Sequence, residues 1–325
     1  MGTKKLILLV WLVSIFTFVA FINATEAGTY PTKPIKLIIN FAAGGTSDFQ
    51  ARLLIEKAEK VLGQPIVAIN KIGAGGTIGV SEVARAKPDG YTIGTCNMPS
   101  LCIIPQMRKL PYDPFKSFTH ICAALPYEYA IMVRADAPWK TWDDFLKYIK
   151  EHPGTVTYGS VGTGTTNHLT MVRIGKTLGL NWVHVPFKGG TKETAALLGG
   201  HVTCINNTKV SVVSPVRAGK IRLLLITSKK RWKFAPEVPT MLEKGFDFYQ
   251  ESYMSIIAPA GIPEEAREKL ERAFKIAIND PDVIKKSAKM YLSPEYMSGK
   301  QYSEVVKRLY KEWGLVLKEL GLKKF

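Results

Sequence analysis

The chain lacks the sequence patterns of several common classes of site. Its four cysteines and five histidines have no metal-ligand spacing, and no HExxH segment occurs. There is also no GxxxxGK[ST] phosphate-binding loop and no GxSxG nucleophile elbow. These absences argue against a zinc enzyme, a P-loop nucleotidase and a serine hydrolase. We expect neither a metal nor a cofactor, and no catalytic residue.

Acidic residues are few. The 325 residues include 27 Asp and Glu against 44 Lys and Arg, which gives a net charge of +17. Such a balance suits a nucleic acid, an anionic membrane surface or an acidic small molecule, and composition does not choose among them. With 46% hydrophobic and 22% charged residues, the chain is neither disordered nor a multi-span membrane protein, and its length favours two domains.

The N-terminus has the order of a secretory signal. Lys4 and Lys5 precede an uncharged stretch over residues 6–24, and small residues offer cleavage sites near Ala24 or Ala27. An uncleaved anchor helix is the alternative, but the prolines that follow at once favour cleavage. Export argues against a nucleic-acid role. It also takes the cysteines into an oxidising compartment, where buried thiols and disulfides both remain open.

Short apolar strands alternate with helical segments from residue 35 onward, as in βαβ units with parallel sheets. The strands are expected at 35–41, 66–70, 91–95, 129–133, 155–160, 182–185, 202–205, 221–227 and 253–258. The helices are expected at 49–62, 77–85, 142–150, 166–178, 192–198, 263–279, 282–289 and 302–320, with an irregular stretch over 99–118. This pattern predicts two α/β lobes, with the chain crossing near 127–130 and 252–256. One large open sheet is the alternative.

Two strand–glycine loop–helix units are the candidate binding elements. One loop spans residues 41–48 and the other residues 160–168. Glycine lets a ligand approach the backbone, while free N–H groups and the dipole at a helix start attract an anion. The pair therefore predicts a site for a carboxylate or phosphate between the lobes. A third segment, Gly73–Gly79, lacks the third glycine of a dinucleotide fingerprint because Ile78 stands in its place.

At these loops the sequence resembles the periplasmic solute-binding proteins of tripartite tricarboxylate transporters, the Bug family. The resemblance extends over nearly the whole exported chain. The segments that carry it are 30–35, 41–48, 63–65, 73–76, 87–92, 110–114, 185–190, 218–222 and 258–261. It implies a type II-like, Venus-flytrap fold with a ligand cleft between two lobes, one formed by residues 28–128 and 253–325 and the other by 129–252.

The resemblance also implies the function and the site. It predicts a periplasmic protein, a monomer, that captures a small di- or tricarboxylate or related acid and delivers it to a two-subunit membrane permease. The ligand-binding residues it predicts are Phe41, Gly44, Gly45, Thr46, Ser47, Asp48, Ser160, Thr163, Gly164, Thr165, Thr166, His168 and Asn207. Asn207 stands where some members have an aspartate for a ligand's amino group, so a cationic ligand is less favoured.

Three points stay open in the sequence. The chain could be an exported α/β enzyme acting on an anionic substrate, with Asp48 or His168 as its base, or a ligand-sensing protein. Lys209 could meet a further acidic group of the ligand or lie solvated at the rim of the cleft. The identity of the carboxylate is not encoded in the motifs.

Overall fold

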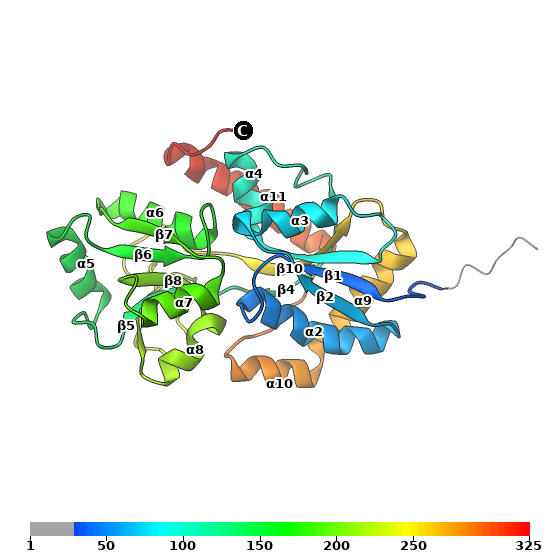
Figure 1. Ribbon diagram of the computed structural model, residues 1–325, viewed down its shortest axis with the longest axis horizontal. Helices are drawn as coiled ribbons and strands as arrows, with labels where there is room; N and C mark the ends of the chain where they lie inside the picture. Colours follow the sequence, from blue (N-terminus) through cyan, green and yellow to red (C-terminus); the bar gives the residue numbers. More distant parts are fainter. Residues whose placement is uncertain (1–28) are drawn as a thin grey trace, which may run out of the picture.

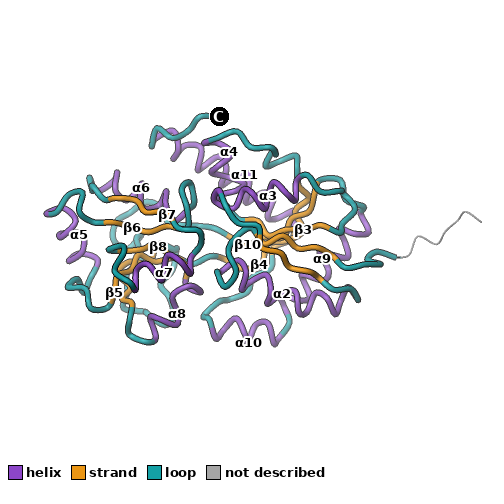
Figure 2. Tube along the Cα trace, viewed as in Figure 1, coloured by secondary structure: helices purple, strands orange, loops and turns teal. Residues whose placement is uncertain are grey.

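A computed structural model describes residues 29–325, which form two lobes, each a β-sheet flanked by helices (Figure 1). The predicted signal segment lies outside the described residues. Two separate sheets exclude the single open sheet. Helices and strands alternate along both lobes (Figure 2), as the sequence pattern predicts. Within residues 29–325, no helix is both long and apolar enough to cross a membrane.

The first lobe contains a six-stranded sheet of order β11-β4-β10-β3-β1-β2. Its strands are β1 (Ile35–Ile39), β2 (Ile66–Asn70), β3 (Thr92–Cys96), β4 (Phe118–Pro126), β10 (Tyr253–Pro259) and β11 (Met297–Ser298). Strand β1 runs parallel to β2 and β3, but β10 runs antiparallel to β3 and β4. The expectation of purely parallel sheets is therefore wrong, because β4 and β10 carry the chain between the lobes in opposite directions.

Helices cover both faces of this sheet because the side chains of β1 alternate between them. Leu37 and Ile39 pack in one cluster with α2 (Thr46–Leu62), α9 (Glu264–Asn279) and α10 (Pro281–Lys289), while Ile38 packs in another. The second cluster includes α3 (Thr77–Ala84), α11 (Gly299–Glu319) and the π-helical turn η2 (Pro99–Ile103). Two short segments, η1 (Ala74–Gly76) and α4 (Ile104–Met107), complete the lobe.

The second lobe contains a five-stranded sheet of order β7-β6-β8-β5-β9. Its strands are β5 (Tyr129–Arg134), β6 (Thr157–Ser160), β7 (Val183–Pro186), β8 (Cys204–Thr208) and β9 (Ile221–Ile226). Its helices are α5 (Trp142–Glu151), α6 (Thr166–Leu178), α7 (Gly190–Leu198) and α8 (Lys209–Arg217). Thr141 and Asp144 form a capping box at the start of α5. This sheet is also mixed, because β5 is antiparallel to both of its neighbours.

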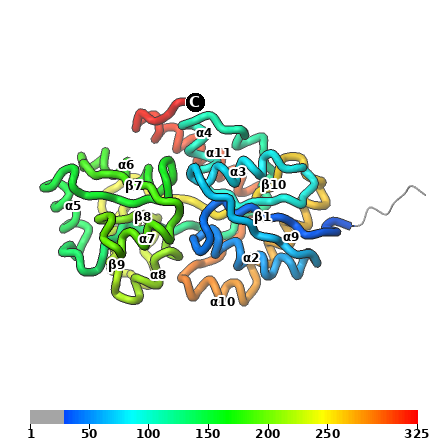
Figure 3. Tube along the Cα trace, in the orientation of Figure 1, coloured from blue at the N-terminus to red at the C-terminus, as the bar shows by residue number. Residues whose placement is uncertain are grey.

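Two segments carry the chain between the lobes, one from β4 to β5 and one into β10 (Figure 3). They lie side by side, with Tyr127 N donating to Ser252 O at 2.8 Å. The sequence prediction missed β4, β11, the short turn η1, the helical turns over 99–107, and α8, which contains Pro215. All four cysteines are buried free thiols.

Candidate functional site

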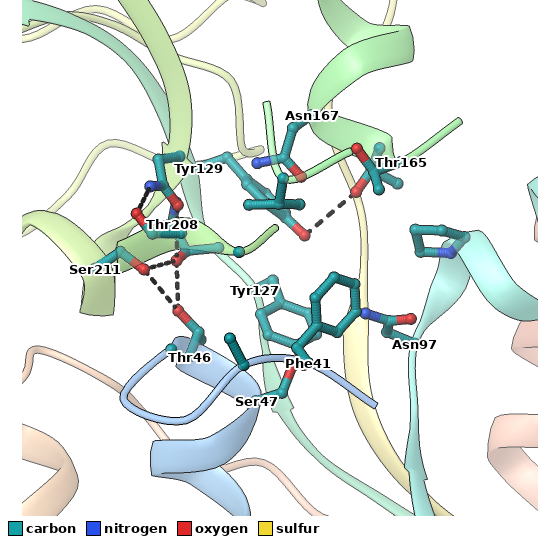
Figure 4. Close-up of a pocket in the computed structure, with 18 residues that line it drawn as sticks. Phe41, Thr46, Ser47, Asn97, Tyr127, Tyr129, Thr165, Asn167, Thr208 and Ser211 are labelled. Atoms are coloured by element: carbon teal, nitrogen blue, oxygen red, sulfur yellow. Dashed lines mark hydrogen bonds between the residues drawn. The ribbon is translucent and has the colours of Figure 1, made fainter. Parts of the chain in front are cut away.

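A pocket lies between the two sheets where the lobes touch (Figure 4). Its empty space, including the part that is open to solvent, is about 460 Å³. Eighteen residues line it: Phe41, Ala42, Gly45, Thr46, Ser47, Asn97, Pro99, Tyr127, Tyr129, Val161, Thr165, Thr166, Asn167, Gly189, Gly190, Asn207, Thr208 and Ser211. Residues from both lobes and from the crossing segment at Tyr127 and Tyr129 therefore enclose one space.

The N-termini of four helices converge on this pocket. The N-cap residue of each helix is in the lining: Gly45 for α2, Thr165 for α6, Gly189 for α7 and Thr208 for α8. The first turn of a helix has N–H groups without an acceptor in the helix, and the dipole places partial positive charge there. All four helices therefore direct donors and positive potential at one point.

Most of these donors are not occupied by side-chain caps. The caps of α2, α7 and α8 make no side-chain hydrogen bond, and only α6 is capped, by Thr165. Within residues 29–325, the lining contains no Asp, Glu, Lys, Arg or His. The pocket is suited to an anion whose charge is met by backbone dipoles and neutral donors rather than by a side-chain cation.

Hydroxyl groups link the elements around the pocket. Thr46 Oγ1 lies 2.5 Å from Thr208 Oγ1, and Ser47 Oγ lies 2.8 Å from Tyr127 OH. Tyr129 OH reaches from β5 to the start of α6 (Figure 4). Burial raises the pKa of Tyr129 to about 12 and raises the pKa of Tyr127 as well. Both phenols therefore stay protonated near neutral pH and can donate hydrogen bonds to a ligand.

Asn207 is buried at the base of the pocket with its amide fully engaged. Its Nδ2 donates to Gly190 O at 2.9 Å and to Thr194 Oγ1 at 3.1 Å. Its Oδ1 accepts from Thr208 N at 2.7 Å. The side chain thus joins the starts of α7 and α8 and brings no charge to the pocket.

Known proteins are similar to this chain in sequence and in fold. Residues 50–322 match the model of the tripartite tricarboxylate transporter family receptor. The chain belongs to this family. It is 37% identical over 299 residues to the UPF0065 protein in the gbd 5′ region of Cupriavidus necator, covering 92% of this chain and 91% of that one.

Solved structures agree with the family. The periplasmic binding protein BugD is 30% identical with a TM-score of 0.86, covering 91% of this chain and 100% of that one. Rpa4515 of R. palustris, a structure with adipate, is 26% identical with a TM-score of 0.86 and the same coverage. The resemblance drawn from the sequence and the two-lobe binding-protein fold are confirmed.

The receptor's pocket contains seven of the thirteen predicted site residues: Phe41, Gly45, Thr46, Ser47, Thr165, Thr166 and Asn207. The other six lie outside its lining: Gly44, Asp48, Ser160, Thr163, Gly164 and His168. Asp48 instead stabilises the first loop. Its carboxylate accepts hydrogen bonds from Gly44 N at 3.0 Å and from Arg52 Nε at 2.9 Å. Gly44 therefore belongs to the loop's own hydrogen bonding.

Two histidines form hydrogen bonds with the second loop of the receptor. His168 Nδ1 accepts from Gly164 N at 3.2 Å, and Ser160 Oγ lies 2.7 Å from His184 Nε2. Burial lowers the pKa of His168 to about 3 and that of His184 to about 4. Both rings are thus neutral near neutral pH. Thr163 lines a neighbouring hollow instead, together with the third glycine segment.

Sequence reasoning missed the contributions of α7 and α8 to the receptor's pocket. Gly189 and Gly190 lay within a family motif, but nothing in one sequence placed them beside the two loops. At Gly190 an added Cβ would lie 2.6 Å from Ser211 Oγ and 2.9 Å from Asn207 Oδ1. A larger residue at position 190 would therefore displace Ser211 or Asn207 from its present position.

Lys209 takes neither of the two positions considered for it. Its side chain is 4% exposed and pairs with Glu128 in the segment between the lobes. Its Nζ also donates to Tyr291 O at 3.0 Å. Burial lowers the pKa of Lys209, while Glu128 opposes that shift. The lysine is a buried link between α8, the crossing segment and the first lobe.

Proposed function

We propose that this chain captures a small organic carboxylate, a di- or tricarboxylate or related acid, in the periplasm and delivers it to a two-subunit membrane permease. The observation that carries the proposal is the convergence of four helix N-termini on a pocket without charged side chains. A carboxylate satisfies such donors, because its two oxygens accept several N–H and O–H bonds.

The carboxylate would lie between the starts of α2 and α6. Thr46 and Ser47 begin α2, Thr165 and Thr166 begin α6, and all four line the pocket. Tyr127 and Tyr129 add protonated phenols from the crossing segment. Binding of one anion by both lobes would favour the arrangement in which the lobes touch. The adipate-bound relative supports the ligand class.

The remaining parts of the proposal concern the whole protein. We place the lobe boundaries at residues 128/129 and 252/253, where β4 leads into β5 and the chain leads into β10. A single chain supplies both walls of the pocket, which supports a monomer as the binding unit. We propose no chemical step, because the polar side chains of the lining are hydroxyls and amides without a base for proton transfer.

A ligand screen tests this function. Purified protein without its leader would be titrated calorimetrically with straight-chain dicarboxylates, citrate, aromatic monoacids and amino acids, and each acid that binds would be compared with its neutral amide. We expect at least one acid to bind and its amide to bind at least about a hundredfold more weakly, because the helix N-termini favour negative charge. Recovery of a chemically altered acid, or equal binding of acid and amide, would refute the proposal.

A further inference from the structure

Two segments of the chain contain basic residues and no acidic ones. Residues 209–236 include eight Lys and Arg without a single Asp or Glu, and residues 283–294 include three Lys, again without an acid. The first segment covers α8, β9 and the loop after β9, in the second lobe. The second segment covers most of α10 and the turn after it, in the first lobe.

Tyr291 joins these two segments in space. Its ring lies 4.4 Å from the ring of Phe234 and 4.6 Å from the guanidinium carbon of Arg217. Its carbonyl accepts from Lys209 Nζ at 3.0 Å. Helices α8 and α10 accordingly lie on the same side of the molecule (Figure 1). Both acid-free segments therefore contribute to one side, across the boundary between the lobes.

Seven exposed cations in these segments have no carboxylate partner among residues 29–325: Arg217, Lys220, Lys229, Lys230, Lys233, Lys285 and Lys289. We call five of them, Arg217, Lys230, Lys233, Lys285 and Lys289, the basic face. Over α11, by contrast, acids and cations are mixed: Lys307 pairs with Glu304, and Arg308 pairs with Glu251 and Glu312, although Lys300, Lys311 and Lys318 have no carboxylate partner among residues 29–325. The basic face is a local excess of positive charge because the two segments that supply it contain no acid.

We propose that the basic face binds the anionic headgroups of a lipid bilayer. Its charges are mostly lysine ammonium groups, which are compact, flexible point charges without the fixed fork of arginine. They are spread over α8, the loop after β9 and α10, in two different lobes. Mobile lipid phosphates can gather around such dispersed charges, whereas a folded protein would need matching acids at fixed positions.

This inference goes beyond ligand capture. Attraction to an anionic leaflet contributes roughly fivefold in affinity per lysine near the surface and decays within a Debye length of about 8 Å at physiological salt. A receptor held by five such charges would stay concentrated beside the membrane yet exchange readily. The pocket is formed by other residues, so membrane binding and ligand binding are separable.

Vesicle sedimentation tests the proposal. The protein without its leader would be mixed with vesicles of phosphatidylethanolamine and phosphatidylglycerol, or with vesicles of phosphatidylcholine alone, at low and at physiological salt. The test variant is Lys230→Glu/Lys233→Glu/Lys289→Glu. The control, Lys109→Glu/Lys116→Glu/Lys311→Glu, has the same net charge but changes exposed lysines near α4 and α11, on the opposite side (Figure 1).

We expect binding to the phosphatidylglycerol vesicles only, weakened by salt. The test variant should bind at least about tenfold more weakly and the control less than about threefold. Equal weakening of both variants would overturn the proposal, because net charge would then suffice. Absence of binding to lipid alone, with binding only to bilayers that contain a membrane protein, would also overturn it. Carboxylate titration of the same variants, expected to be unchanged, separates failure here from failure of the proposed function.

Discussion

The hydroxyl oxygens of Thr46 and Thr208 lie 2.5 Å apart, although 162 positions separate the residues in the chain. Thr46 begins α2 in the first lobe, and Thr208 is the N-cap of α8 in the second. Ser211 Oγ lies 3.1 Å from Thr208 Oγ1 and 3.3 Å from Thr46 Oγ1. Three hydroxyls therefore hold two helix N-termini together at the wall of the pocket.

Replacing either threonine by valine keeps the side-chain shape and removes its hydroxyl. We expect Thr46→Val and Thr208→Val each to weaken binding of the best carboxylate about five- to tenfold, since one net hydrogen bond contributes about 1 kcal/mol. The double variant should lose less than the sum of the two losses, because both changes remove the same bond. Calorimetric titration measures the three affinities.

Thr119→Val serves as the control for these variants. Thr119 is a partly buried threonine of β4, outside the pocket lining, and valine suits a strand. Its affinity for the carboxylate should equal that of the wild type. Strictly additive losses in the Thr46/Thr208 pair would show that the two hydroxyls act independently, against a shared bond.

Gly189 and Ala42 test how closely the lobes must approach. Gly189 has a φ of 122°, and a Cβ there would lie 3.1 Å from the Cβ of Ala42 in the other lobe. Gly189→Ala should weaken carboxylate binding about tenfold or more, since overpacking costs 1–3 kcal/mol. Adding Ala42→Gly should restore part of the affinity because it removes the opposing carbon. If adding Ala42→Gly restores no carboxylate affinity, the whole loss comes from the backbone at the start of α7 and not from contact with Ala42.

Local patterns predicted most helices and strands, because the sequence itself carries their signals. The apolar run that contains Leu37, Ile38 and Ile39 indicated a strand at 35–41, and its side chains are buried on both faces of the sheet. Local sequence patterns failed for segments whose secondary structure depends on tertiary contacts. Helix α8 was not predicted and contains Pro215, yet it forms with Val212 buried in the cluster of the second sheet.

The binding site, like the fold, was predicted only where a local sequence pattern marks it. The starts of α2 and α6 were predicted because a glycine loop before a helix is visible in sequence. Asp48 and His168 were candidate ligand-binding residues, and each accepts a hydrogen bond from the backbone of its own loop. Gly189 and Thr208 reach the pocket through the order of strands in the second sheet, β7-β6-β8-β5-β9, which no local pattern encodes.

Lys209 should matter for stability and not for ligand choice. Lys209→Met leaves Glu128, 24% exposed, without its partner. A fully buried pair would lose 3–5 kcal/mol on removal of one member, so we expect about 2 kcal/mol here, seen as a lower Tm in thermal unfolding. Adding Glu128→Gln should recover more than half of that loss. Carboxylate affinity should be unchanged in both variants, and a selective loss of dicarboxylate binding would return Lys209 to the ligand site.

Glu193 should make stability fall as the pH rises. This residue of α7 is fully buried, neither carboxylate oxygen has a hydrogen-bond partner, and burial raises its pKa well above the usual value. Because the folded state holds the proton more tightly than the unfolded state, its contribution is complete below about pH 4.3 and is lost as the pH rises toward the folded pKa. The slope reaches about 1.4 kcal/mol per pH unit at most.

Glu193→Gln removes this titration while keeping the shape of a neutral carboxyl. Thermal unfolding of the wild type and the variant from pH 5 to pH 8 should show the variant gaining relative stability as the pH rises. Glu237→Gln, at an exposed position, is the matched control and should track the wild type at every pH. If the difference in stability between Glu193→Gln and the wild type is constant across that range, Glu193 does not change its protonation there on unfolding. Its burial then does not depend on a retained proton.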